Sequence, residues 1–289
     1  MKTHISNPAI MFALIAITML FANVNTLVGQ EETKKLVAVC STTQIADFTR
    51  QVVGDRWEVI CVLAPGEDPH TYEVGNDDLA SVKRADLCLE NGWNLEGHAW
   101  MSNLAKTAGK PIVTCVENVD PLKVDEEGKS VNDPHAWFNT TNASIYVTNI
   151  RNAVSKIDPK HADEYKSRAA LYIIQLEGLN YWINETVNAI PKARRILVTH
   201  HDAFGYFSQA YGFKAISPVG WTTGELTGVS IEQRQGIVNQ IREFGVKSIF
   251  IETSINRETL EGIAKETGIS IGGELYSDAM GGKGSAGET

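Results

Sequence analysis

The stretch DPKHADEYKSRAALYIIQLEGLNYWINETVNAIP, residues 158–191, determines how the rest of the chain is organised. Asp158 and Pro159 supply a helix cap followed by proline at the first helical position. Apolar side chains then recur at steps of three and four residues, as on one face of a helix: Tyr165, Ala169, Ile173, Leu176, Leu179, Ile183, Val187 and Ile190. This pattern predicts one helix over 159–190, about 45 Å long, which Pro191 ends.

Short apolar runs alternate with amphipathic stretches on both sides of this helix. The runs predict strands at 35–40, 57–63, 86–90, 111–115, 195–200, 214–219, 247–252 and 270–275. The amphipathic stretches predict helices at 43–54, 75–85, 96–108, 231–244 and 257–267. Such alternation is typical of parallel sheets with helices on both faces, so the predicted fold class is α/β.

The predicted helix divides this α/β chain into two domains. We expect an N-terminal α/β domain over 31–139, a helical segment over 140–191 and a C-terminal α/β domain over 192–289. No strand pattern occurs between Thr140 and Ile190, so the long helix is expected to be a stiff connection. The acidic, proline-interrupted loop 116–134 reads as a surface connection.

The first thirty residues have the make-up of a secretory signal peptide. Lys2 precedes an apolar run from Ala9 to about Val24, and small and polar residues lead up to Gln30. A membrane anchor is the alternative, although the run is marginally shorter than the roughly 18 residues that a span needs. We expect residues 1–30 to be removed and the protein to be periplasmic and soluble, because no cysteine near residue 30 is placed to carry a lipid.

The composition argues against two classes of partner. The formal net charge is −9, and removal of residues 1–30, which contain Lys2 and no acidic residue, changes it to −10. An acidic chain is a poor match for nucleic acid or an anionic membrane, whereas it is compatible with a cation as ligand.

Each of the four cysteines lies inside a short apolar run: Cys40, Cys61, Cys88 and Cys115. In such runs a thiol behaves as a small apolar side chain, so we expect free buried thiols. One disulfide between neighbouring strands is the alternative in an exported protein. The spacing does not suit a CxxC metal site.

Four of the six histidines after residue 30 lie in three short motifs: Asp68-Pro69-His70, Asp133-Pro134-His135 and His200-His201-Asp202. Proline stiffens each Asp-Pro-His turn, so the imidazole leaves the backbone in a fixed direction. A carboxylate two residues before the histidine is placed to accept a hydrogen bond from the ring and so fix its tautomer.

The positions of these motifs matter more than their composition. His70, His201 and Asp278 follow predicted strands, and His135 ends the connection that follows strand 111–115. Ligands bind beyond the carboxyl ends of parallel strands, so these four side chains are expected to meet between the domains and bind one divalent metal ion. We expect Asp68, Asp133, His200 and Glu252 to lie next to these four side chains and to orient them. His98 and His161 stand alone on predicted helices and are expected to be solvated.

Five segments carry a resemblance to a known family: GEDPHTYE (66–73), DPHAWF (133–138), LVTHHDAFGYF (197–207), IFIETS (249–254) and GGELYSDAMG (272–281). With these motifs the chain resembles the zinc- and manganese-binding solute-binding proteins of ABC importers over residues 35–285. The resemblance implies two α/β domains joined by one helix, with the metal ligands His70, His135, His201 and Asp278. It also implies delivery of the metal to a membrane permease driven by a cytoplasmic ATPase. We further expect a monomer.

Two features depart from the family pattern. Members that bind zinc very tightly often carry a histidine-rich loop between the first two histidine ligands, and the corresponding loop here has no histidine. Members usually continue past the Tyr-Ser-Asp segment into a final helix, whereas this sequence ends at Thr289. The C-terminal domain is therefore expected to lack an element, or the sequence to be part of a longer one.

The ligand types leave the cargo open. Three imidazoles and a carboxylate suit four-coordinate zinc, while a bidentate Asp278 would raise the coordination number and suit manganese; iron is also an option. A zinc hydrolase is one alternative function, because three ligands and a water form a catalytic pattern. Four protein ligands leave no position for that water, however, so a non-enzymatic role is predicted. A metal-binding surface adhesin is the other alternative.

Overall fold

The computed structural model describes residues 34–288, apart from residue 127 and residues 218–229. The predicted signal peptide, residues 1–30, lies outside the described residues, as do the last two positions of the strand predicted at 214–219. Leu36–Thr289 form one compact unit. Among the described helices, none has both the length and the apolar character that a membrane span requires.

The first part of the unit is a parallel sheet in the order β2-β1-β3-β4. Its strands are β1 (Leu36–Cys40), β2 (Trp57–Cys61), β3 (Leu87–Glu90) and β4 (Ile112–Thr114). Alternate residues of a strand point to opposite faces, so Ala38 and Cys40 join one apolar cluster, while Val37 and Val39 join another. The helix α2 (Thr43–Val53) covers the first face, and α3 (Asn76–Arg84) and α4 (Trp100–Ala108) cover the second.

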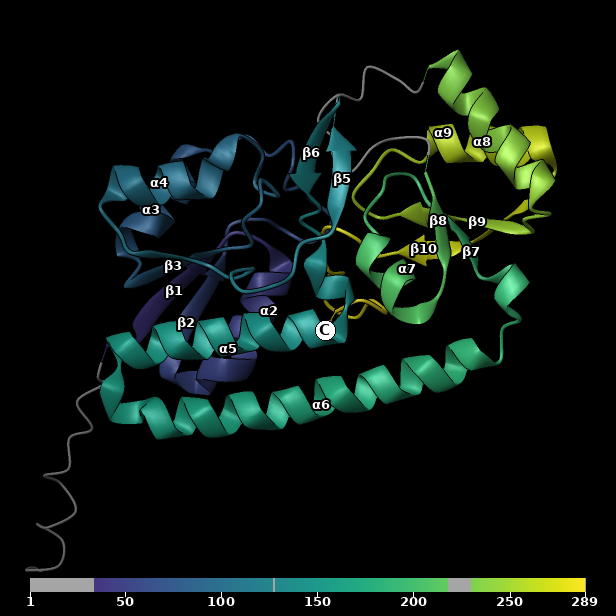
Figure 1. Ribbon diagram of the computed structural model, residues 1–289. Coiled ribbons are helices and arrows are strands. Elements are labelled where there is room, and N and C mark those ends of the chain that lie inside the picture. The colour runs from purple at the N-terminus through teal and green to yellow at the C-terminus, as the bar shows by residue number, and fades with distance from the viewer. Residues whose placement is uncertain (1–33, 127, 218–229, 289) are drawn as a thin grey trace, which may run out of the picture. The chain divides into compact units, whose positions relative to one another are not determined.

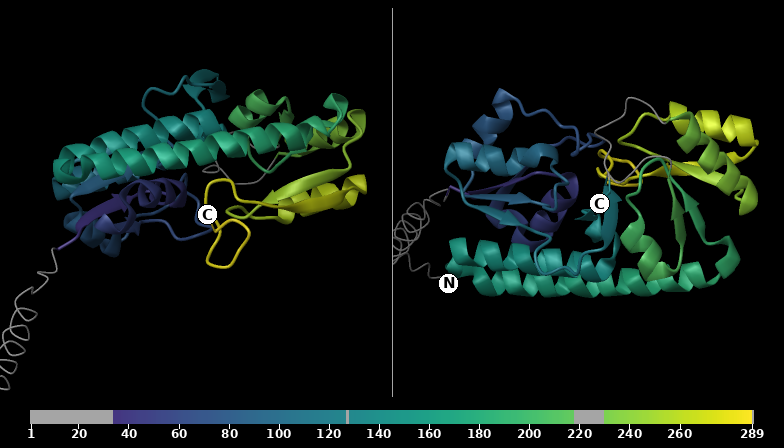
Figure 2. Two further views of the ribbon diagram at one scale, coloured as in Figure 1. Left: turned by 90° about the horizontal axis from the view of Figure 1, so that it is seen from below. Right: turned by 45° about the horizontal axis from the view of Figure 1, so that its top comes forward.

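Two long helices lie side by side beneath this sheet, as Figures 1 and 2 show. They are α5 (Thr140–Ile157) and α6 (Ala162–Asn188), joined by a short 3-10 turn at Pro159–His161. The predicted long helix is therefore present, and Tyr165, Ala169, Leu176 and Val187 of its predicted apolar face are buried. Leu179 is 44% exposed, because the middle of α6 extends past α2 and α5 before it reaches α7.

The second part of the unit carries two parallel strand pairs, β7 (Ile196–Val198) with β8 (Lys214–Ile216) and β9 (Ser248–Glu252) with β10 (Ser270–Leu275). Helices α8 (Ile231–Glu243) and α9 (Glu258–Thr267) pack on these strands through a separate apolar core. Ser230 and Gln233 form a capping box that starts α8. The predicted α/β class with parallel sheets is thus confirmed, while the predicted domain boundaries stay a prediction.

Two elements differ from the sequence-based expectation. The loop 116–134 contains an antiparallel hairpin of β5 (Lys123–Glu126) and β6 (Lys129–Asn132). Its strands are short and polar, so they lack the apolar run that marks a buried strand. A short helix, α7 (Gly205–Tyr211), follows the His-His-Asp motif and is too brief to show a helical period.

All four cysteines are free thiols, and those of Cys40, Cys88 and Cys115 are buried. Cys40 aligns with Cys61 on the neighbouring strand. Burial raises the pKa of the Cys40 thiol to about 12, which suppresses the reactive thiolate. The expectation of free buried thiols therefore agrees with the structure for Cys40, Cys88 and Cys115, whereas the free thiol of Cys61 is half-buried.

Candidate metal site

His70 is held by a rigid turn after β2. The Asp68 Oδ1 atom accepts a hydrogen bond from the His70 backbone N at 2.9 Å. The carbonyl oxygen of Pro69 accepts from Trp100 Nε1 at 2.9 Å and from the backbone N of Gly97 at 3.3 Å. The start of α4 and the turn before it therefore fix the direction in which the imidazole leaves the chain.

His135 follows the β5–β6 hairpin and is fully buried. The Oδ1 atom of Asp133 accepts from the His135 backbone N at 2.9 Å and lies 2.8 Å from the ring Nδ1. Asn91 Nδ2 donates to the Pro134 carbonyl oxygen at 3.0 Å. The carboxylate two residues before this histidine thus contacts the ring, as expected from the Asp-Pro-His motif.

His201 follows β7 and is supported by Glu252, the last residue of β9. The Glu252 Oε1 atom accepts hydrogen bonds from the backbone N atoms of His200 and His201, at 2.8 and 3.0 Å. Its Oε2 atom lies 2.6 Å from His201 Nδ1. One buried carboxylate therefore sets both the backbone turn and the ring orientation of His201, while His200 contributes its backbone N to the same contact.

Asp278 lies on the loop after β10 and is fully buried, like Ser277 beside it. Helix α2 holds this loop, because Gln44 Nε2 donates to the Ser277 carbonyl oxygen at 2.9 Å. The backbone N of Met280 donates to Thr43 Oγ1 at 2.8 Å.

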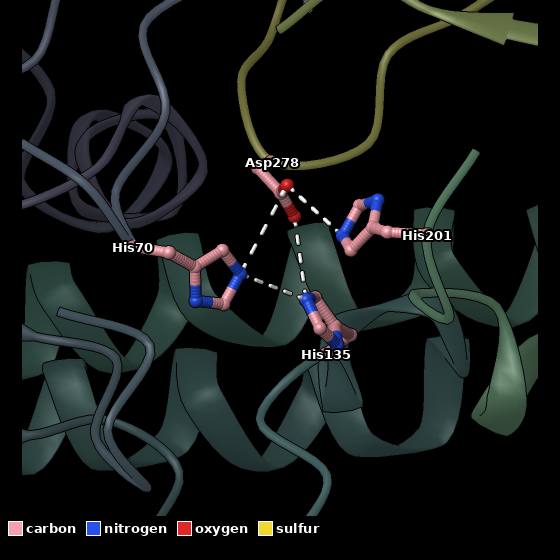
Figure 3. A group of neighbouring side chains, drawn as sticks. All are labelled: His70, His135, His201 and Asp278. Carbon is pink, nitrogen blue, oxygen red and sulfur yellow. Dashed lines mark hydrogen bonds and ion pairs between the residues drawn. The ribbon is translucent and has the colours of Figure 1, made fainter. Parts of the chain in front are cut away.

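The structure brings together the four side chains that the sequence singles out, and Figure 3 shows them pointing at one another. Each offers one ligand atom, and all four atoms lie within 4.8 Å of one another. His201 Nε2 is 3.1 Å from Asp278 Oδ2, and His135 Nε2 is 3.4 Å from Asp278 Oδ1. His70 Nε2 is 3.3 Å from His135 Nε2 and 4.0 Å from Asp278 Oδ2. The group comes from loops after four different strands, β2, β6, β7 and β10.

These contacts require a cation. We assign the Nδ1 proton of His135 to the bond with Asp133 and that of His201 to the contact with Glu252. Each neutral ring then directs its Nε2 lone pair at the Asp278 carboxylate. Two electron-rich atoms repel at such distances, and buried charges are normally paired or bound to metal. A proton on the ring or a metal ion among the four side chains removes the repulsion.

The lowered pKa values of Asp278 and Glu252 also indicate that positive charge stabilises this site. Although burial opposes ionisation, the nearby His201 and His135 rings keep the pKa of Asp278 well below its usual range. The His201 ring likewise keeps the pKa of Glu252 low against the effect of burial. Burial lowers the pKa of His70 to about 3, so this ring is neutral and ready to bind metal at neutral pH.

Several contacts around the four side chains were not anticipated from the sequence. Asn91, Trp100 and Tyr206 bond the Asp-Pro-His turns, and Thr43 and Gln44 bond the loop of Asp278. The run NGWNLEGHAW (91–100) directly after β3 was the signal for the first two, because it too begins at a strand end. His98 is exposed, and His161 Nδ1 lies 2.7 Å from Asp158 Oδ2, so neither joins the site.

The chain matches a family model and known proteins over most of its length. The model of the family "zinc-uptake complex component A, periplasmic" (ZnuA) matches residues 38–289. The metal ABC transporter substrate-binding lipoprotein SsaB of Streptococcus sanguinis is 31% identical over 285 residues, 96% of this chain and 91% of that protein.

Two solved structures share the fold at similar identity. The periplasmic zinc-binding protein TroA of Treponema pallidum matches with a TM-score of 0.82 and 31% identity, covering 88% of this chain and 93% of that one. A manganese-bound periplasmic metal-binding protein of Candidatus Liberibacter asiaticus matches with a TM-score of 0.77 and 30% identity, covering 88% and 94%.

Proposed function

This chain belongs to the family of periplasmic zinc-uptake components, and from that membership we propose that it is the extracytoplasmic metal-capturing subunit of an ABC importer. In this role it binds one divalent transition metal ion, zinc or manganese, and delivers it to a membrane permease. The observation that carries the proposal is the buried group of His70, His135, His201 and Asp278, whose ligand atoms lie within 4.8 Å of one another.

The donor set supports a metal cargo over an organic one. Three imidazole nitrogens and one carboxylate match the ligands that zinc takes in proteins, and they also suit manganese when the carboxylate binds through both oxygens. Asp133 and Glu252 lie behind two of the rings, the arrangement that orients metal-binding histidines. The family is one of solute-binding proteins, which is not an enzyme class.

The remaining parts of the proposal concern context. We propose a monomer outside the cytoplasm, with an N-terminal α/β domain, a helical segment and a C-terminal α/β domain at the predicted boundaries. SsaB is a lipoprotein, whereas the first cysteine of this sequence, Cys40, is buried in β1. A lipid on that thiol is therefore not part of the proposal.

The direct test is the metal content of the full chain. We expect one equivalent of bound metal after purification from its own compartment, measured by inductively coupled plasma mass spectrometry. Saturating metal should also stabilise the fold, by about 4 kcal/mol at a free concentration 1,000 times the Kd. Competition between zinc and manganese then names the cargo. A protein with no stoichiometric metal after exposure to either ion would refute the proposal.

Metal binding should release protons at neutral pH. Burial disfavours a charged His135 ring, but hydrogen bonds to Asp133 and Asp278 outweigh it and raise the pKa to about 9. Against the same effect of burial, Asp278 and Glu252 raise the pKa of His201 well above its usual value. Both rings must lose a proton to bind metal. Affinity should therefore rise about tenfold per pH unit for each proton displaced.

Calorimetric titrations in two buffers of different ionisation enthalpy measure the protons released. The proton on the His135 ring also stabilises the metal-free fold, because the pKa of this ring is higher in the folded state than in the unfolded state. This stabilisation is complete below about pH 6.5 and is lost as the pH rises through about 9. An affinity that stays constant from neutral pH to about pH 9, the pKa of His135, would contradict this prediction.

A further inference from the structure

The loop that carries Asp278 is held on both sides of the ligand by the first two residues of α2. Gln44 Nε2 donates to the carbonyl oxygen of Ser277 at 2.9 Å, one residue before Asp278. Thr43 Oγ1 accepts from the backbone N of Met280 at 2.8 Å, two residues after it. We name residues 276–281 the Asp278 loop.

These two hydrogen bonds join different parts of the fold. The loop leaves β10, which pairs with β9, whereas α2 packs on the four-stranded sheet of β1–β4. The bonded residues are 233 and 237 positions apart in the sequence. Asp278 is therefore supplied by the strands of the second part of the chain but fixed in place by a helix of the first.

The Gln44–Ser277 bond is sheltered from water, which strengthens it, while the Thr43–Met280 bond is part-buried. Ser277 and Asp278 are fully buried, and Gln44 is only 8% exposed. A hydrogen bond in such surroundings does not compete with solvent, and breaking it leaves buried polar groups unpaired.

The α2 end of the contact is also rigid. Thr42 caps the helix, since its side chain accepts from the backbone N of Ile45. Thr43 Oγ1 donates to Gln44 Oε1 at 3.1 Å, which orients the amide so that its nitrogen faces Ser277. The donor and the acceptor are thus pre-arranged before the loop docks, so little freedom is lost when it does.

We propose that Thr43 and Gln44 are positioning residues that hold the Asp278 loop against α2 and thereby set the rate at which bound metal leaves. The inference rests on the proposed function. Asp278 is the ligand that approaches all three imidazoles, so a metal ion is freed only when its carboxylate withdraws. That withdrawal requires the hydrogen bonds from Gln44 and to Thr43 to open.

The test compares isosteric losses with matched controls. Gln44→Met and Thr43→Val each remove one of the two hydrogen bonds to the loop at nearly constant shape, and each also removes the bond between Thr43 and Gln44. Thr43→Ser keeps the hydroxyl, and Gln235→Met makes the same change on the exposed side of α8. Stopped-flow release of zinc to a chromogenic chelator gives koff, and mixing with zinc gives kon.

We expect koff to rise roughly fivefold for each loss, the factor that corresponds to one ordinary hydrogen bond. The double variant should show less than the product of about 25-fold, because Thr43 and Gln44 are hydrogen-bonded to each other. The value of kon should stay unchanged, because encounter with the ion does not involve these bonds. Thr43→Ser and Gln235→Met should release zinc at the rate of the unaltered protein.

Hydrogen exchange of the metal-free chain separates this inference from the proposed function. Amides of residues 276–281 should exchange faster in Gln44→Met and Thr43→Val than in Gln235→Met, whether or not the chain binds metal. The inference would be overturned if the amides of residues 276–281 exchanged at an unchanged rate in Gln44→Met and Thr43→Val. It would also be overturned if their exchange became faster while koff for zinc stayed unchanged. An unaltered protein without stoichiometric metal would instead overturn the proposed function.

Discussion

Replacing Asp278 by asparagine should reduce the affinity for a divalent metal by more than about 100-fold, since loss of a mere supporting group already costs 10–100-fold. The substitution keeps the shape of the side chain and removes the negative charge that faces all three imidazoles. It should also reduce the protons released on binding, because the Asp278 charge helps to raise the pKa of His135 and His201. Isothermal titration with zinc measures both quantities.

His98→Ala is the control for the loss of metal, because it changes an exposed histidine outside the cluster. It should bind one equivalent with the affinity of the unaltered protein. An Asp278→Asn variant with full stoichiometry and unchanged Kd would exclude this carboxylate as a ligand.

A companion variant, His201→Ala, separates transport from catalysis. It removes the imidazole that lies closest to the Asp278 carboxylate, at 3.1 Å. We expect metal stoichiometry to fall with it. If the variant instead kept its metal and lost a hydrolytic turnover of the unaltered protein, the site would be catalytic and the importer proposal would fail.

Gly97→Ala should damage both the stability of the fold and the position of His70. A Cβ atom at Gly97 would lie 2.0 Å from the carbonyl oxygen of His70. Neither backbone can give way easily, because Gly97 and Trp100 both donate to the Pro69 carbonyl oxygen next to it. Overpacking of this kind costs about 1–3 kcal/mol of unfolding free energy, and the displaced His70 should lower metal affinity by roughly 10–100-fold.

Urea unfolding with and without zinc separates the two effects. Gly178→Ala is the matched control, because Gly178 lies on α6 with no other atom within 4 Å of the added Cβ. Alanine there should be neutral or stabilise the fold by up to about 1 kcal/mol. A Gly97→Ala protein with the stability and the affinity of the unaltered chain would show that the turn adapts, and would remove Gly97 from the support of His70.

The four candidate ligands come from distant segments of the chain, and most are held by hydrogen bonds from the same part of the fold. His70 and His135 are fixed by turns on the β1–β4 side, where Asn91 and Trp100 bind the carbonyl oxygens of their Pro residues. His201 is fixed by Glu252 of β9. Among the described residues, the Asp278 loop is hydrogen-bonded at two points to the other part of the fold. For His135 the contact of this kind is the bond from Tyr206 of α7 to the Asp133 carbonyl oxygen. Because both bonds of the Asp278 loop cross between the two parts, we expect metal release to begin at Asp278.

Much of this arrangement was already determined by the sequence. The regular alternation of apolar runs and amphipathic stretches predicted the parallel sheets, because the periods of a strand and a helix are local properties of the chain. His70, His201 and Asp278 follow predicted parallel strands, and His135 ends the connection after strand 111–115. Because ligands bind beyond the carboxyl ends of such strands, these positions predicted that the four side chains meet.

Only the tertiary structure decided the rest. The hairpin β5–β6 has two short polar strands whose pairing gives no apolar period. The hydrogen bonds from Gln44 and to Thr43 span more than two hundred residues, and no local pattern encodes a contact at that separation. The sequence therefore predicted which four side chains gather, because periodicity and motif position are local. Asp133 and Glu252 were expected from the sequence as supporting groups, whereas the contacts from Gln44 and Asn91, at 2.9 and 3.0 Å, depend on how distant segments of the chain pack together.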